Sequence, residues 1–147
     1  SKTSLNDVRC VRSDRDLNIW LPNFSDNNNG TISHESTGLI WQKDYSTNKY
    51  WEQTISYCEG LSLGGANDWR LPNIKELQTI VDYDKDSPAI DPTFFNNTMS
   101  SYYWSSTTAA NTSSRINGVH FGEGLVNTVQ INSSYSSWYI RCVRGGQ

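Results

Sequence analysis

The segment Gly64-Gly65-Ala66-Asn67-Asp68-Trp69-Arg70-Leu71-Pro72 decides the fold that this sequence predicts, because it marks a loop that becomes a helix. The diglycine gives the backbone freedom to turn, and Pro72 fixes one dihedral angle where a first helical turn needs no amide hydrogen. Asn73 and Glu76 follow at positions from which they can serve that first turn. We expect the helix to continue through Asp82.

Two helices with one apolar face each are predicted. The apolar residues after Pro72 recur at spacings of three and four, which indicates a buried face; they are Ile74, Leu77, Ile80 and Val81. A first helix is expected from about residue 50 to residue 61, and its apolar face consists of Trp51, Ile55, Cys58 and Leu61. Both faces need a partner, which the strands described next can supply.

Strand patterns lie on both sides of the helices. Short strands are predicted at 17–20, 31–33, 37–42 and 102–107, and the tail is predicted to form a meander of strands at 118–121, 125–131 and 137–143. Residues 83–99 have no periodicity and are expected to be a loop anchored by Ile90, Phe94 and Phe95. The pattern indicates an α+β domain, with two helices packed on a small antiparallel sheet and long irregular loops.

Composition supports one domain with an aromatic core. The chain has 147 residues, of which only 35% are hydrophobic, yet it contains six Trp and eight Tyr. Residues 7–13 nearly duplicate residues 139–145. We interpret residues 1–13 either as the end of an upstream domain of the same kind or as an extra N-terminal strand, and residues 14–147 as a single domain.

Charge and hydropathy exclude several classes of function. The net charge of −3 argues against holding a nucleic acid by bulk charge, and no run of apolar residues is long enough for membrane insertion. Residues 25–30 resemble a calcium loop, but Ser36 stands where the bidentate glutamate is required, so a hairpin turn is expected there. His34 and His120 lack companions at zinc-ligand spacing. We expect no metal and no cofactor.

Catalytic motifs are not visible, so we expect a protein that is not an enzyme. The sequence contains no nucleophile elbow and no phosphate-binding glycine loop. The hydroxyl run at 105–108 has no identifiable base.

Cys58 lies on the first predicted helix and Cys142 on the last predicted strand, so a disulfide between them would close a loop of more than eighty residues. Such a bridge stabilises a fold by about 4 kcal/mol in the loop-entropy account. The alternative is a pair of buried, reduced thiols. Cys10 would then be unpaired, or bridged to a partner.

The basic residues fall into two groups. Arg70, Arg141 and Arg144 lie in ordered motifs and are expected to form structural ion pairs or backbone contacts, with Glu76, Asp68 and Asp82 as candidate partners. The others lie in loops and are candidates for binding anionic groups of a glycan; they are Lys43, Lys49, Lys85 and Arg115.

Several motifs in order resemble one known family. They are Thr37–Gln42 with Trp41, Tyr57-Cys58, Asp68–Pro72 with Trp69 and Arg70 followed by Glu76-Leu77, Tyr103–Ser106 with Trp104, and Arg141–Arg144. This set is similar to the Lcl C-terminal domain family, named for the C-terminal domain of a collagen-like adhesin of Legionella, over about residues 26–145. The match implies that these motif residues build the scaffold.

The resemblance implies an exported bacterial domain of C-type-lectin-like or formylglycine-generating-enzyme-like shape, in which a disulfide from the first helix to the last strand is familiar. It implies a secreted or cell-surface adhesin module that recognises host or matrix glycans, including sulfated glycosaminoglycans. We assign recognition to the loops at 44–50, 83–99 and 109–117. A protein–protein interaction or assembly module is the alternative. A collagen-like stalk would imply a trimer, but this chain contains no such segment, and its acidic balance does not favour polyanions.

Overall fold

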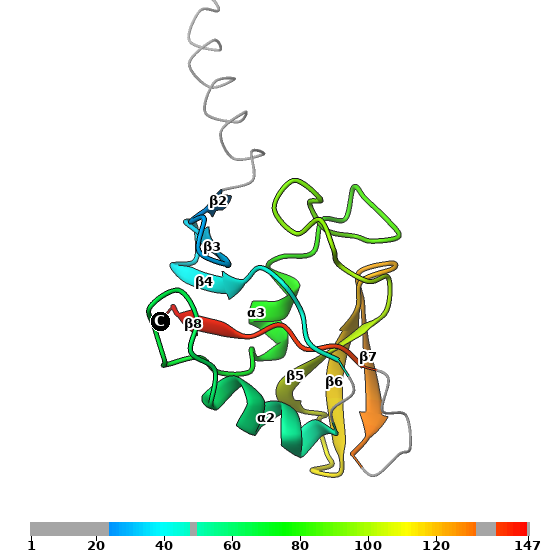
Figure 1. The fold of residues 1–147 in the computed structure, drawn as a ribbon. Coiled ribbons are helices and arrows are strands. Elements are labelled where there is room, and N and C mark those ends of the chain that lie inside the picture. The colour runs from blue at the N-terminus through cyan, green and yellow to red at the C-terminus, as the bar shows by residue number, and fades with distance from the viewer. Residues whose placement is uncertain (1–23, 48–49, 132–137, 147) are drawn as a thin grey trace, which may run out of the picture.

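The computed structural model describes residues 24–47, 50–131 and 138–146, which form an α+β domain with two antiparallel sheets and two helices (Figure 1). The first sheet has the strand order β2-β3-β4-β8, and the second has the order β5-β6-β7. The strands of the first sheet are β2 (Phe24–Asp26), β3 (Thr31–His34), β4 (Leu39–Gln42) and β8 (Val143–Gly145). Those of the second are β5 (Tyr102–Thr108), β6 (Arg115–His120) and β7 (Leu125–Gln130), and the helices are α2 (Trp51–Glu59) and α3 (Ile74–Gln78).

The prediction of one sheet with a C-terminal meander was wrong. β6 and β7 do pair as a hairpin, in register from Arg115 opposite Gln130 to His120 opposite Leu125. The last segment does not extend this hairpin: Tyr139 forms a parallel bridge with Tyr103, and the chain then crosses to β4, where Val143 lies opposite Trp41. The C-terminal segment therefore joins the two sheets (Figure 1).

Helix α3 is shorter than predicted. Asn73 caps it as expected, since its side chain accepts the Glu76 amide at 2.8 Å while the Glu76 carboxylate accepts the Asn73 amide at 3.0 Å. The α-helix ends at Gln78 instead of reaching Asp82, and the following amides of residues 79–81 bond three residues back, in the tighter 3₁₀ pattern. The run Thr79-Ile80-Val81 is β-branched, which disfavours further α-helix.

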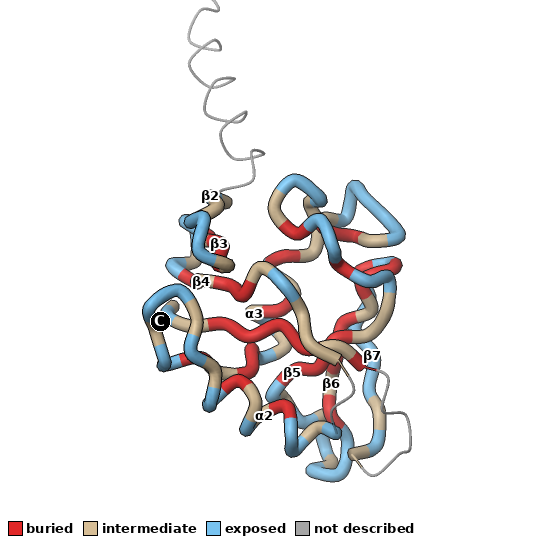
Figure 2. The backbone as a smooth tube through the Cα atoms, viewed as in Figure 1, coloured by how far each residue is buried: buried red, intermediate tan, exposed pale blue. Residues whose placement is uncertain are grey.

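Two clusters of buried side chains hold the elements together, and Figure 2 shows buried residues along β4, β8 and β5. The first contains Trp41, Leu77, Phe95 and Tyr103, and the second contains Trp69, Trp104 and both disulfide cysteines. The predicted helix faces pack as expected: Ile80 is buried, and Ile74 and Val81 contact the first cluster, while Trp51, Ile55 and Leu61 contact the second. The motif tryptophans thus act as scaffold.

Cys58 and Cys142 are bonded, and both side chains are fully buried. The bridge ties α2 to the residue before β8 across a sequence separation of 84 residues. The loop 83–99 contains no helix or strand, and Ile90 and Phe95 anchor it in the core while Phe94 packs against it, as predicted. The predictions for residues 1–13 and 17–20, for Cys10 and for Lys49 lie outside the described residues.

Candidate functional site

A tight hairpin at Leu63–Ala66 forms the centre of the candidate site. The two residues exchange both backbone hydrogen bonds, at 3.0 and 3.1 Å, and the glycines between them have φ values of +62° and +79°. Left-handed backbone at both central positions is the two-residue turn that matches strand twist, and glycine adopts it without steric cost. The Trp69 indole donates to the Leu63 carbonyl at 3.2 Å, which fixes the hairpin on the second core cluster.

The hairpin lies against the asparagine-rich turn between β2 and β3. A Cβ atom at Gly64 would come within 2.9 Å of the Thr31 methyl and 3.1 Å of the Asn29 amide nitrogen. Only glycine therefore fits where the two turns meet. A hairpin turn was predicted at 25–30, and the structure confirms it with positive φ at Asn28 and Gly30, but limits it to 27–30 because Ser25 and Asp26 belong to β2.

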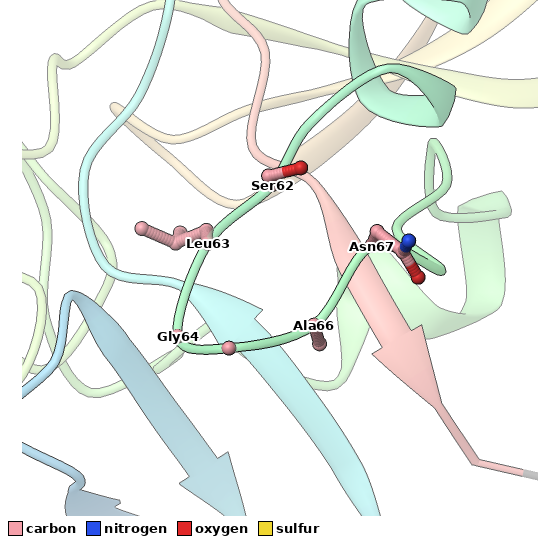
Figure 3. A pocket seen from close by; sticks show the side chains of 6 residues that line it. Ser62, Leu63, Gly64, Ala66 and Asn67 are labelled. Carbon is pink, nitrogen blue, oxygen red and sulfur yellow. The ribbon is translucent and has the colours of Figure 1, made fainter.

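Two adjoining hollows open at the hairpin, with volumes of about 370 and about 90 Å³; residues 62–67 alone line the larger one, and the smaller one also touches the β2–β3 turn. Figure 3 shows the larger one, with Leu63 and Asn67 on opposite arms of the loop. The smaller one continues from the shared residues Leu63, Gly64 and Ala66 to Asn29 and Arg144. We call this pair of hollows the hairpin hollow; its remaining polar lining comes from Ser62, Asn67, Asn27 and Thr31.

The polar lining is made mainly of amides and hydroxyls, and the structure organises part of it. Asn29 Oδ1 accepts hydrogen bonds from the Thr31 hydroxyl at 2.7 Å and from the Thr31 amide at 3.2 Å. Asn67 is exposed, and its side chain makes no hydrogen bond within the described part of the chain. An amide of this kind offers two donors and one acceptor to a ligand.

Ion pairs frame the hairpin hollow on the side of β8. Arg144 Nε and Nη2 donate to the two carboxylate oxygens of Asp68, the second at 3.2 Å, and these bonds lower the pKa of Asp68. Arg70 binds Glu76 with two bonds of 2.7 Å and donates to the Gly145 carbonyl at 2.9 Å. Both pairings use candidate partners predicted from sequence; Asp82 instead lies 3.9 Å from Lys85.

The Arg70–Glu76 ion pair lies at the N-terminus of α3. Partial burial raises the pKa of Glu76, but the hydrogen bonds from Arg70 and Asn73 outweigh it, so the net shift is downward. The Arg70 backbone also exchanges hydrogen bonds of 2.9 Å with Val143. This segment therefore clamps α3 to β8.

Arg70→Ala should lower stability and spare the ligand site, because the guanidinium faces Glu76 and lies outside the lining of the hairpin hollow. Since the Arg70 side chain is 40% exposed, we expect a loss of only about 1 kcal/mol, or about 3 °C in Tm. Thermal unfolding of Arg70→Ala beside Arg70→Lys, which keeps the charge without the bidentate geometry, measures it. Lost ligand affinity at an unchanged Tm would contradict this role.

His34, in β3, is another titratable side chain whose pKa the fold shifts. It is 7% exposed, its ring lies 4.5 Å from that of Phe24, and its Nε2 lies 3.0 Å from the Ser36 hydroxyl. Its Nδ1 has no hydrogen-bond partner among the described residues. Burial lowers the pKa of His34 because it disfavours the charged imidazolium.

The domain should therefore lose stability as the pH falls below about 6.5, the ordinary pKa of histidine, since the unfolded chain then binds a proton that the folded chain resists. Urea unfolding between pH 7 and pH 5 measures this, and the window avoids titration of the carboxylates. His34→Gln should flatten the dependence. An equal slope in both proteins would show that His34 is not its source.

Of the loop cations predicted to bind anionic groups, the three that the structure describes, Lys43, Lys85 and Arg115, do not come together. Lys43 forms an ion pair of 2.6 Å with Asp26. Lys85 lies in an acidic segment that also contains Asp82, Asp84 and Asp86. That segment bonds to residues 121 and 122, beyond one end of β6, while Arg115 begins β6 at the other end, about 20 Å away. Among the described residues, only Lys75 and Arg115 have cationic side chains without a hydrogen bond or ion pair.

The predicted ligand loops also need a correction. Residues 115–117 belong to β6, because their register with β7 continues through Arg115, so the loop there is limited to 109–114. The loops at 44–47 and 83–99 do meet, through a 2.7 Å bond from Asn97 to Asp44. The described tryptophans are buried or partly buried, and the exposed aromatic side chains of this part of the chain are Tyr50 and Tyr83.

Sequence reasoning did not find the hairpin hollow, because it treated 64–72 as scaffold alone. The clue available in the sequence was a pair of glycine-containing turns, at 27–30 and 63–66. Their contact depends on how β3 and the segment after α2 cross in space, which local patterns do not report.

The structure describes no group of three or more His, Cys, Asp or Glu side chains that could hold a metal ion. None of its described helices has the length and apolar character to cross a membrane.

These features define a small α+β domain in which a disulfide and a buried aromatic core support exposed polar turns. The sequence profile of the Lcl C-terminal domain matches residues 30–144, so the chain belongs to the Lcl C-terminal domain family. Membership indicates a surface adhesin-type module. No curated protein matches the chain.

Proposed function

We propose that this domain is a non-catalytic, extracellular binding module that recognises a neutral glycan in the hairpin hollow. The observation that carries the proposal is the lining: exposed asparagine amides and the Ser62 hydroxyl border a concavity whose charged neighbours, Arg144 and Asp68, neutralise each other. Sugar hydroxyls both donate and accept hydrogen bonds, as do asparagine amides and Ser/Thr hydroxyls. Rigid placement by two tight turns reduces the ordering that binding would otherwise require.

A sulfated glycan is less well supported. Binding of a polyanion requires several cations on one face. The described cations are mostly paired or buried, and the two unpaired ones, Lys75 and Arg115, lie on different elements, α3 and β6.

We further propose that the domain is secreted or surface-bound and has the C-type-lectin-like shape that the family resemblance implies. The disulfide, which suits an oxidising compartment, and its path from the first described helix to the C-terminal segment support this assignment.

A glycan array followed by titration calorimetry tests the function. Asn67→Ala should weaken binding of a neutral oligosaccharide about tenfold, because one amide hydrogen-bond pair is lost. Asn96→Ala is the matched control, since Asn96 is an exposed amide on the loop 83–99 and does not line the hairpin hollow. Retention on heparin that is unaffected by Asn67→Ala, with no neutral glycan bound, would overturn the proposal.

A further inference from the structure

β7 is the most exposed of the described strands. Residues 125–128 are all exposed, and Leu125 and Val126, which point to opposite faces, are 53% and 40% exposed. No described strand pairs with the outer edge of β7, and Figure 1 shows β7 as the outer strand of its sheet. By contrast, the outer edge of β5 is covered, because Tyr139 exchanges backbone bonds with residues 102 and 104.

The β7 strand lacks the usual protections of a free edge. Its sequence Leu-Val-Asn-Thr-Val-Gln contains no lysine, no other charge and no proline, and its register with β6 runs without a bulge. Free edges in soluble proteins normally carry at least one of these features, which prevent pairing with another strand. An unprotected edge of this kind is a surface for strand addition.

The hydrogen-bond register shows which backbone groups are available. The Ile131 amide donates to the Ser114 carbonyl at 2.9 Å, in the same register as β6 and β7. Because antiparallel bonds alternate along a strand, residues 125, 127 and 129 bond to β6, and the backbone groups of Val126 and Thr128 point outward.

We propose that β7 pairs antiparallel with β7 of a second copy of this chain, and that the two-fold axis passes at Asn127. The outward groups permit symmetric registers centred on Asn127 or on Thr128. The first places Leu125 opposite Val129 and Val126 opposite Thr128, whereas the second places Val126 opposite Gln130 and Asn127 opposite Val129. Apolar and β-branched pairs stabilise a sheet more than mixed pairs, so the Asn127 register is preferred.

Charge complementarity selects a second copy as the occupant. Exposed Glu123 lies beyond one end of β7, close to the acidic segment 82–86, and exposed Arg115 lies at the other end, opposite Gln130. Antiparallel pairing brings the acidic end of each copy beside the Arg115 end of the other. Both contacts are satisfied at once by the two-fold symmetry.

Sedimentation velocity of the whole chain from about 10 to 500 µM should show a reversible monomer–dimer equilibrium, since a contact of one strand pair buries less than a permanent interface. Asn127→Lys places two like charges opposite each other and should abolish the dimer without changing Tm. Thr93→Lys, which adds the same charge at an exposed position on another loop, should leave it intact.

Cross-linking tests the register. In a Cys10→Ser background, Asn127→Cys should form a disulfide-linked dimer on mild oxidation, because a facing non-hydrogen-bonded pair has Cα atoms about 4.5 Å apart. Val129→Cys should not, since the two sulfurs would then be separated by about 14 Å along the strands. A monomer at every concentration, together with no cross-link from Asn127→Cys, would overturn the proposal.

Discussion

Replacing Arg141 by alanine should lower the free energy of unfolding by about 3–5 kcal/mol, the largest effect of any single substitution that we expect. The Arg141 side chain is 1% exposed and forms no ion pair with any carboxylate of the described residues. Its guanidinium donates to the carbonyls of Gln42 and Lys43 and to the Thr98 hydroxyl, and lies 4.9 Å from the centre of the Phe95 ring. Removal leaves these acceptors without a donor and opens a cavity between β4 and the loop 83–99.

Urea unfolding monitored by tryptophan fluorescence measures this loss. Arg141→Lys should recover only part of the stability, because one ammonium cannot reproduce the planar fork that reaches acceptors on two segments. Lys75→Ala, at an exposed position on α3, is the control and should change stability by less than about 0.5 kcal/mol. An Arg141→Ala protein as stable as this control would contradict the role assigned to the buried guanidinium.

Removing the Cys58–Cys142 disulfide should cost about 4–5 kcal/mol, because the bridge closes a loop of 84 residues in the unfolded chain. It also joins α2 to the segment that connects the two sheets, and both cysteines belong to the second core cluster. We expect a large drop in the urea midpoint for the Cys58→Ala/Cys142→Ala variant.

Treatment with a reductant distinguishes the stability contributed by the disulfide from that contributed by packing of the two side chains. Dithiothreitol should lower the midpoint of the wild-type protein nearly to that of the double variant, and should not affect the double variant itself. An unchanged wild-type midpoint under conditions that reduce the thiols would show that the bridge contributes little.

Local patterns predicted the helix positions and most strands. Capping residues and helical spacing located α2 and the start of α3, since Asn73, Glu76 and Leu77 act within one turn. The same patterns did not predict the end of α3, where the β-branched run after Gln78 outweighs apolar spacing. They also did not predict that the chain near Tyr139 leaves the β6–β7 hairpin, because that choice depends on which sheet edge is free in three dimensions.

The structural residues were easier to predict than the site. Trp41, Trp69 and Trp104 are buried, and Arg70 and Arg144 bind the predicted carboxylates. These roles could be predicted because each residue belongs to a short sequence motif. The hairpin hollow lies where two turns about 35 residues apart in sequence meet. Their contact is visible only in the structure, where Gly64 packs against Thr31 and Asn29. The segment that decides the fold therefore also borders the proposed binding surface.

Mapping a bound neutral oligosaccharide by backbone amide NMR tests the account most directly. We predict that the largest chemical-shift changes on titration occur at residues 27–31 and 62–67, the two turns that form the hairpin hollow, and that they shrink in Asn67→Ala. Shifts confined to the loops at 83–99 or 109–114, with residues 62–67 unchanged, would contradict the account and place ligand recognition elsewhere on the domain.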